Sequence, residues 1–151
     1  MSEPRYTYLH TLADLDAHQD WLPEIFAIHK QFRPAMNDFT AYEQLLRTMM
    51  SENQRLLLVD YGKPPFIGIA MFNMHHNTYQ NKMMMLEDLV IDESLRGTNI
   101  GSQVLTEIER FGRENGCEHL GLDSGVYRGR AHKFYFLHGY VAESFHFTKA
   151  L

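Results

Sequence analysis

One segment, residues 83–102, limits what this chain can fold into more than any other. It opens with an apolar run, Met83–Ile91, whose length and composition are typical of a buried strand. A short acidic loop then leads into a glycine-containing stretch that starts at Arg96 and reads RGTNIGS. The apolar residues after it recur at the spacing of a helix face, so we expect a helix over Asn99–Asn115 that ends at Gly116. A strand, a glycine loop and an amphipathic helix in succession indicate an α/β fold.

The other elements follow from hydrophobic periodicity and turn residues. The expected strands are Arg5–Leu12, Leu56–Val59, Phe66–Met74, Met83–Ile91, Cys117–Leu122 and Tyr140–Phe147. The expected helices are Asp14–Phe32, capped by Asp14 or Asp16, Ala41–Ser51, capped by Thr40, Asn99–Asn115 and Arg130–His138. This β-α-α-β-β-β-α-β-α-β order predicts a single α/β domain over residues 1–151. Its mixed sheet combines an antiparallel meander with a right-handed crossover.

Charge, hydropathy and cysteine content exclude several functional classes. The 151 residues carry 19 acidic and 14 basic side chains, for a formal net charge of −5, which argues against a protein that coats nucleic acid. No apolar stretch is as long as the roughly 18 residues that a membrane span requires. The N-terminus has no apolar core behind basic residues, so we expect a cytoplasmic protein. The single cysteine rules out an internal disulfide framework.

The glycine loop has the features of an anion-binding site. Gly97 and Gly101 let the backbone lie close to a ligand, and the first amides of the following helix point outward at the positive end of the helix dipole. Such a helix start binds pyrophosphate without needing a positive net charge, and Arg96 can add a bidentate contact. The same residues also fit a plain turn in which Asn99 is only the N-cap. The loop lacks both the Lys-Ser/Thr ending of a Walker loop and the G-x-G-x-x-G dinucleotide fingerprint.

The loop and its surroundings resemble the GNAT superfamily of acetyl-CoA-dependent N-acetyltransferases. The acetyl-CoA loop of that family reads Gln/Arg-x-x-Gly-x-Gly/Ala, and residues 96–101 here read Arg-Gly-Thr-Asn-Ile-Gly. The similarity covers Met83–Leu151, with matches at Leu86–Ile91, Ser124–Gly125, Arg128, Arg130–Tyr135 and Gly139–Tyr140. Asn99 stands where the family has its middle glycine, but asparagine adopts turn conformations readily, so the loop can keep its path. Arg128 stands where many members place an asparagine.

The resemblance implies acetyl-CoA as co-substrate and a central sheet that splays where the pantetheine arm lies. The arm is expected along the end of the strand before the loop, where a backbone amide near Leu89 faces the thioester oxygen. The pyrophosphate is expected on the loop amides. The residues implied in acetyl-CoA binding are Leu89, Val90, Ile91, Arg96, Gly97, Thr98, Asn99, Ile100, Gly101, Ser102, Arg128 and His132.

The resemblance also implies two catalytic roles. In polyamine acetyltransferases, to which this segment is similar, an acid at the position of Glu87 acts as base through water. Glu87 lies in a mostly apolar strand, where we expect a raised carboxyl pKa, and Asp88 faces the opposite side unless a bulge intervenes. A tyrosine at the position of Tyr135 is frequent in the family, which implies that its phenol protonates the leaving thiolate. The alternatives are an exposed or Arg-paired strand acid and a core tyrosine.

The acceptor is the least constrained part of the prediction. Family members bind it between the first two helices and the sheet, here near Phe32–Phe39. The favoured function is transfer of an acetyl group from acetyl-CoA to a primary amine of a small molecule, by direct attack in a ternary complex. A protein N-terminal or lysine acetyltransferase and a catalytically silent acyl-CoA-binding or interaction module are the alternatives.

Partners other than these substrates are few in the prediction. The aromatic strand Tyr140–Phe147, together with the family resemblance, makes a homodimer an expectation. Neither nucleic acid nor a membrane is expected as a partner. No metal site is expected either, because the adjacent His75 and His76 point to opposite faces of a strand and cannot easily chelate one ion.

Overall fold

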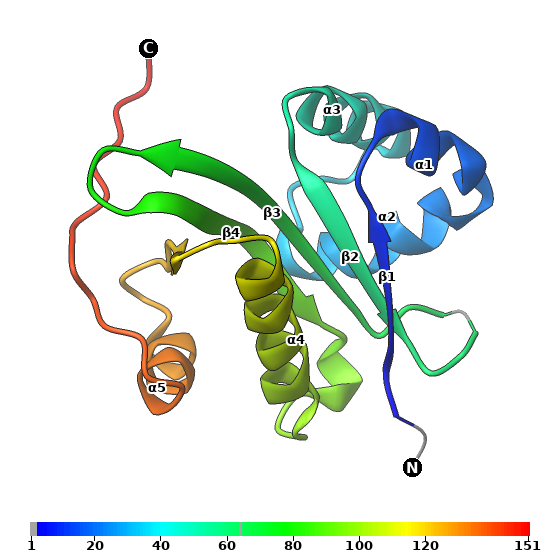
Figure 1. Ribbon diagram of the computed structural model, residues 1–151. Coiled ribbons are helices and arrows are strands. Elements are labelled where there is room, and N and C mark those ends of the chain that lie inside the picture. The colour runs from blue at the N-terminus through cyan, green and yellow to red at the C-terminus, as the bar shows by residue number, and fades with distance from the viewer. Residues whose placement is uncertain (1–2, 64) are drawn as a thin grey trace. The chain divides into compact units, whose positions relative to one another are not determined.

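The structure, a computed structural model, describes residues 3–63 and 65–151. The chain forms two compact units, 1–121 and 122–151. The first unit holds most of the sheet, with helices on both of its faces (Figure 1). The second holds one helix and an extended C-terminal segment.

The sheet follows the chain order β1-β2-β3-β4-β5. Its strands are β1 (Arg5–Leu9), β2 (Arg55–Asp60), β3 (Gly68–Asn77), β4 (Asn81–Ile91) and β5 (His119–Leu122). The pairs β1–β2, β2–β3 and β3–β4 are antiparallel. β5 begins beside the start of β4, because the Glu118 N–H donates to the Lys82 carbonyl at 2.8 Å. The predicted α/β class with a mixed sheet is confirmed.

The helices are α1 (Leu12–Ala17), α2 (Leu22–Phe32), α3 (Phe39–Ser51), α4 (Ile100–Glu114) and α5 (Gly129–Leu137). The single helix expected over Asp14–Phe32 is wrong. The chain leaves the helix at His18, makes a 3-10 turn and starts α2 with Pro23 in its first turn, where proline is tolerated. The expected caps are also wrong, because Thr11 caps α1 and Asp38 caps α3. In both cases a residue just upstream supplies the oxygen that accepts from a first-turn amide.

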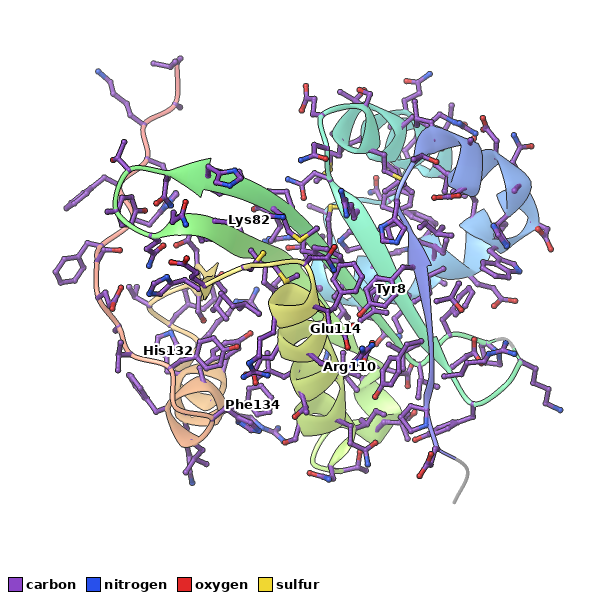
Figure 2. All side chains as sticks on the ribbon, viewed as in Figure 1. Tyr8, Lys82, Arg110, Glu114, His132 and Phe134 are labelled. Carbon is purple, nitrogen blue, oxygen red and sulfur yellow. The ribbon has the colours of Figure 1, made fainter. Side chains whose placement is uncertain are left out.

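Two layers of side chains cover the sheet in the first unit. Helices α1–α3 pack on one face over an apolar cluster that includes Leu15, Ile25, Leu46, Leu58 and Met71. The other face packs against α4 (Figure 1). There Tyr8 of β1 stacks on Phe111 with ring centroids 4.2 Å apart and donates to Glu107 at 3.0 Å. Figure 2 shows Tyr8 beside this helix, whose Arg110 pairs with Glu107 and with the exposed Glu114.

The last expected strand, Tyr140–Phe147, is wrong for the described chain. Helix α5 ends in a left-handed Gly139, φ +84°, and the Tyr140 N–H bonds back to the Tyr135 carbonyl. Residues 140–151 then run on with no strand among them. Phe145 and Phe147 are 84% and 90% exposed. The alternation that predicted a strand is present in the sequence, but a strand also needs a neighbour to pair with, and periodicity does not specify one.

Candidate functional site

The site starts from an irregularity in β4. Met71 of β3 pairs with Asp88, but the next residue, Phe72, pairs with Leu86, so Glu87 is an extra residue with no partner opposite it. This is a β-bulge, which resets the alternation of side chains along the strand. Leu86 lies opposite Phe72, whose ring contacts Phe111 of α4. Asp88 lies opposite Met71, which belongs to the cluster under α2 and α3.

The bulge brings two neighbouring acids to one pocket. A pocket of about 240 Å³ lies between α2, α3 and the sheet. Its lining residues are His29, Arg33, Met36, Tyr42, Leu45, Leu46, Met49, Met71, Glu87 and Asp88. The expectation that Asp88 faces away from Glu87 is therefore wrong, for the reason the prediction itself allowed. The acceptor region expected near Phe32–Phe39 adjoins this pocket through Arg33 and Met36.

Glu87 is exposed rather than surrounded by apolar groups. Its Oε1 accepts one long hydrogen bond, 3.4 Å, from Asn73 Nδ2. The expectation of a carboxylate buried in an apolar strand is wrong, because Glu87 is the unpaired residue of the bulge and its side chain is exposed. A carboxylate held this loosely at a pocket wall has acceptor capacity for a ligand proton.

Asp88 is held tightly. Its Oδ2 accepts from His29 Nε2 at 2.7 Å and its Oδ1 accepts from Arg33 Nη2 at 2.7 Å. Burial raises the pKa of Asp88, but the hydrogen bonds and charges of His29 and Arg33 outweigh it, so the pKa lies below its ordinary value. Tyr42 OH completes the chain at 2.9 Å from His29 Nδ1. Burial, together with the nearby charge of Asp88, raises the pKa of Tyr42 above its ordinary value, so the phenol keeps its proton.

The glycine loop lies at the start of α4, where residues 96–99 are all exposed. Gly97 has φ +83°, the left-handed conformation that favours glycine. Asn99 has φ −80° and ψ 2°, so it needs no left-handed conformation, and its side chain makes no capping bond. The first helical bond runs from the Gln103 N–H to the Asn99 carbonyl. Gly101 and Ser102 lie in the first turn of α4, the part of a helix at which anions bind.

The end of β4 extends beyond its short neighbour. Leu89, Val90 and Ile91 pair with β3 through Ala70, Ile69 and Gly68. β5 accompanies the start of β4 near Lys82 and has four residues, whereas β4 has eleven. This difference in length agrees with the splay that the resemblance implies at the end of β4. It leaves the role of Leu89, Val90 and Ile91 toward acetyl-CoA a prediction.

The remaining predicted residues lie in the second unit. Tyr135 on α5 contacts the Tyr140 ring edge-on, with centroids 5.7 Å apart, and burial raises its pKa although Arg128 acts in the opposite direction. Arg128 is the N-cap residue of α5, with its guanidinium 5.4 Å from the centre of the Tyr127 ring. The ring of His132 lies 2.9 Å from the Gly125 carbonyl, and Figure 2 labels it at the start of α5. These contacts fix the three side chains locally.

No individual role was predicted from the sequence for three residues that line the pocket, although Arg33 falls within the expected acceptor region. His29, Arg33 and Tyr42 lie on α2, at its C-cap and on α3, in helices without a recognisable motif. The available signal was a histidine beside the apolar Ile25 and Ile28 of one helix, since a buried polar group demands a partner. Within the described residues, no three His, Cys, Asp or Glu side chains are grouped as metal ligands would be. No helix among them is both long and apolar enough to cross a bilayer.

Comparison with known proteins agrees with this geometry. The acetyltransferase (GNAT) family matches residues 15–140, which is most of the chain. This chain belongs to that family, whose members use acetyl-CoA as the acetyl donor.

Two characterised relatives and one solved structure add detail. An aminoalkylphosphonate N-acetyltransferase of Salmonella typhimurium is 38% identical over 80 residues, 53% of this chain and 50% of that protein. A thialysine N-epsilon-acetyltransferase of Bos taurus is 25% identical over 59 residues, 39% of this chain and 35% of that protein. An aminoglycoside N-acetyltransferase solved in complex with CoA superimposes with a TM-score of 0.75 at 16% identity, covering 99% of this chain and 96% of that one. The matched segments span 50% of the first relative and 35% of the second. The fold, in contrast, is shared with the solved structure along nearly the whole chain.

Proposed function

We propose that this chain transfers an acetyl group from acetyl-CoA to the primary amine of a small molecule, by direct attack in a ternary complex. The observation that carries the proposal is the bulge in β4, which puts Glu87 and Asp88 in the wall of one pocket. Carboxylates attract an ammonium group, and a loosely held one can take the proton that an ammonium must lose before it attacks a thioester. The family to which the chain belongs supports the same chemistry.

The size of the pocket favours a small acceptor over a protein chain. Its volume of about 240 Å³ is below the roughly 300–1,000 Å³ of pockets that bury drug-sized ligands. Met36, Leu45 and Met49 line it, which suits a short apolar body. The names of the two relatives, which refer to aminoalkylphosphonates and thialysine, support a small amine as well.

Arg33 supports a finer choice, an amine that also carries an anionic group. Its side chain is 49% exposed and lines the pocket, and its Nη2 donates to Asp88 Oδ1. Its guanidinium lies 4.3 Å from the centre of the Phe32 ring, which limits its motion. A guanidinium fork binds phosphonate and carboxylate groups bidentately. Arg33 next to two carboxylates therefore complements a short zwitterion, and the Salmonella relative is named for aminoalkylphosphonates.

In the proposed reaction, Glu87 and Tyr135 carry out the proton transfers. Acetyl-CoA supplies the activated acetyl group. The ammonium first loses one proton to Glu87, directly or through water. The amine nitrogen then bonds to the acetyl carbon as the carbon–sulfur bond breaks, and Tyr135 donates its phenolic proton to the departing thiolate. The resulting phenolate takes up the second proton that the nitrogen loses, and Glu87 releases its proton to solvent. The raised pKa of Tyr135 keeps the phenol protonated for this task.

Acetyl-CoA binding is assigned to the loop and strand that the sequence pointed out. The left-handed Gly97 and the first-turn amides of Gly101 and Ser102 fit a pyrophosphate. Arg96 and Thr98 to Ile100 complete the loop, and Arg128 and His132 are assigned to the same ligand. Leu89, Val90 and Ile91 are assigned to the pantetheine arm.

The proposal includes a homodimer formed through residues 140–147. This segment is rich in aromatic side chains and has no strand pairing in the described chain. The cytoplasmic location stays a prediction from the sequence.

Calorimetry followed by an amine screen tests the proposed function. We expect micromolar binding of acetyl-CoA but not NAD, and loss of binding in Arg96→Glu and Gly101→Trp. Thiol release should then be seen with (2-aminoethyl)phosphonate, and more weakly with n-butylamine, which lacks the anion. Folded protein that binds neither acetyl-CoA nor CoA would refute the proposal and favour an interaction domain. Binding of acetyl-CoA without turnover of any small amine would favour the protein-acetylating or silent alternatives.

A further inference from the structure

A buried chain of three polar side chains lies behind the acceptor pocket. Asp88 on β4, His29 on α2 and Tyr42 on α3 are 9%, 3% and 4% exposed. They are joined at 2.7 Å, from His29 Nε2 to Asp88 Oδ2, and at 2.9 Å, from His29 Nδ1 to Tyr42 OH. All three line the pocket. The mechanism proposed above uses Asp88 only as one of two carboxylates that attract an ammonium group, and it assigns no role to His29 or Tyr42.

The chemistry of the chain fixes its hydrogen-bond directions. Asp88 is ionised because its pKa lies below the ordinary value, so His29 Nε2 carries the proton and donates it. The phenol of Tyr42 keeps its proton because its pKa is raised. Tyr42 therefore has a proton that it can donate to Nδ1 of His29. A second hydrogen bond of this kind selects one imidazole tautomer and fixes the ring orientation.

The carboxylate of Asp88 has capacity left for a ligand. Each carboxylate oxygen has two acceptor sites, and His29 and Arg33 occupy one site on each oxygen. We propose that Asp88 binds the ammonium group of the acceptor, and that His29 and Tyr42 are positioning residues that hold its carboxylate toward the pocket. This inference rests on the proposed function and divides the work between the two acids of the bulge.

The division follows from their surroundings. Asp88 has a lowered pKa and accepts hydrogen bonds from His29 and Arg33. It is therefore a poor proton acceptor, but it stays negatively charged. Glu87, exposed and held by one long bond, is the better proton acceptor. Changes behind Asp88 should therefore weaken amine binding, whereas changes at Glu87 should slow turnover.

Substitutions at His29 test the inference through a rescue. His29→Leu removes both ring hydrogen bonds, whereas His29→Gln keeps an N–H donor near the position of Nε2. With (2-aminoethyl)phosphonate as probe, we expect KM for the amine to rise about tenfold in His29→Leu and to return to within about threefold of the original in His29→Gln. The kcat and the KM for acetyl-CoA should stay within about twofold of the original, the signature of lost ground-state binding.

Two further variants serve as a control and as a replacement for His29→Leu. His18→Leu is the control, because the His18 ring makes a hydrogen bond to the backbone, with Asp14 O at 2.9 Å, and does not line the pocket. Tyr42→Phe removes only the hydroxyl, so it replaces His29→Leu if that variant fails to fold. It should raise the amine KM about threefold.

The outcomes separate the two claims. An unchanged amine KM in folded His29→Leu and Tyr42→Phe, an equal rise of both KM values, or no rescue by His29→Gln would overturn the inference while leaving the proposed function intact. If the unsubstituted protein binds acetyl-CoA but acetylates neither (2-aminoethyl)phosphonate nor n-butylamine, the proposed function fails first. The inference then falls with it.

Discussion

Glu87 and Asp88 are adjacent in a strand, yet both line the same pocket. In a regular strand two neighbours point to opposite faces. Here the pairing register shifts between Met71 and Phe72 of β3, which forms the bulge. As a result Glu87 stays exposed while Asp88 is buried against His29. Two carboxylates in different surroundings can do different work at one site, because their pKa values are set by what each touches.

Glu87→Gln should abolish most turnover while leaving substrate binding. The amide is close to the carboxylate in shape but cannot accept the amine proton, so we expect kcat to fall about 100-fold or more. Acetyl-CoA affinity, measured by calorimetry, should not change. Glu93→Gln is the control, because Glu93 is also an exposed acid but does not line the pocket. A kcat within about twofold of the original would remove Glu87 from the reaction.

Asp88→Asn should lower stability in a pH-dependent way. The folded-state pKa of Asp88 lies below the ordinary 3.8, so its ionised form stabilises the fold fully above that value. The stabilisation is lost as pH falls through the folded-state pKa. We expect the substitution to cost about 1–3 kcal/mol at pH 7 and the difference from the original protein to shrink below about pH 4.

Urea denaturation at pH 7, 4 and 3 measures this effect. Asp20→Asn, at an exposed position, is the control and should change the free energy of unfolding little at any of these pH values. A difference between Asp88→Asn and the original protein that stays constant with pH would show that the loss is one of packing and not of charge.

The sequence predicted the strand–loop–helix unit well because its signals are local. The apolar run of β4, the glycines of the loop and the helix face of α4 each lie within a few residues of one another. Gly97 took the left-handed conformation, while Asn99 needed none. Glu87 was named from the resemblance, and its exposure was given only as the alternative. A bulge depends on how β3 pairs with β4, and no residue in β4 indicates it.

The pocket residues were missed for a related reason. His29 and Asp88 are 59 positions apart, and nothing in α2 alone says that one of its faces meets a carboxylate. The same limit explains the wrong strand at Tyr140–Phe147. Its alternation is a local signal, but a strand exists only when another strand lies beside it. Hydrophobic periodicity does not predict which distant segment a strand pairs with.

Gly97→Val should weaken acetyl-CoA binding in addition to lowering the stability of the fold. Its φ of +83° forces a β-branched side chain into the left-handed region, at about 1–2 kcal/mol, and the loop must distort to relieve it. Gly62→Val is a matched control with φ +100°, far along the chain from the loop. We expect both variants to lose thermal stability but only Gly97→Val to lose calorimetric affinity for acetyl-CoA. Equal affinities in the two variants would argue against a pyrophosphate on this loop.

Arg33→Gln should change which amines are preferred. Without the guanidinium, the advantage of (2-aminoethyl)phosphonate over n-butylamine in kcat/KM should fall about tenfold or more, since a charge-assisted pair is lost. Arg47→Gln is the control, because Arg47 on α3 pairs with Asp16 of α1 and with Glu43 of its own helix and is not a lining residue. An unchanged ratio would mean that Arg33 serves only to hold Asp88, and the acceptor would then need no anionic group.

The C-terminal segment should make the protein associate. Phe145 and Phe147 have ring centroids 6.5 Å apart and are both largely exposed, as expected of alternate residues on one face of an extended segment. Unpaired backbone and aromatic side chains in such a segment favour pairing with a second copy. We expect light scattering at micromolar concentration to report a dimer, and Phe145→Ser with Phe147→Ser to report a monomer. Val126→Ser, at an exposed apolar residue outside the segment, is the control and should leave the dimer intact. A monomeric original protein would show that the segment stays without a partner, and the side chains of Phe145 and Phe147 would then face solvent in solution.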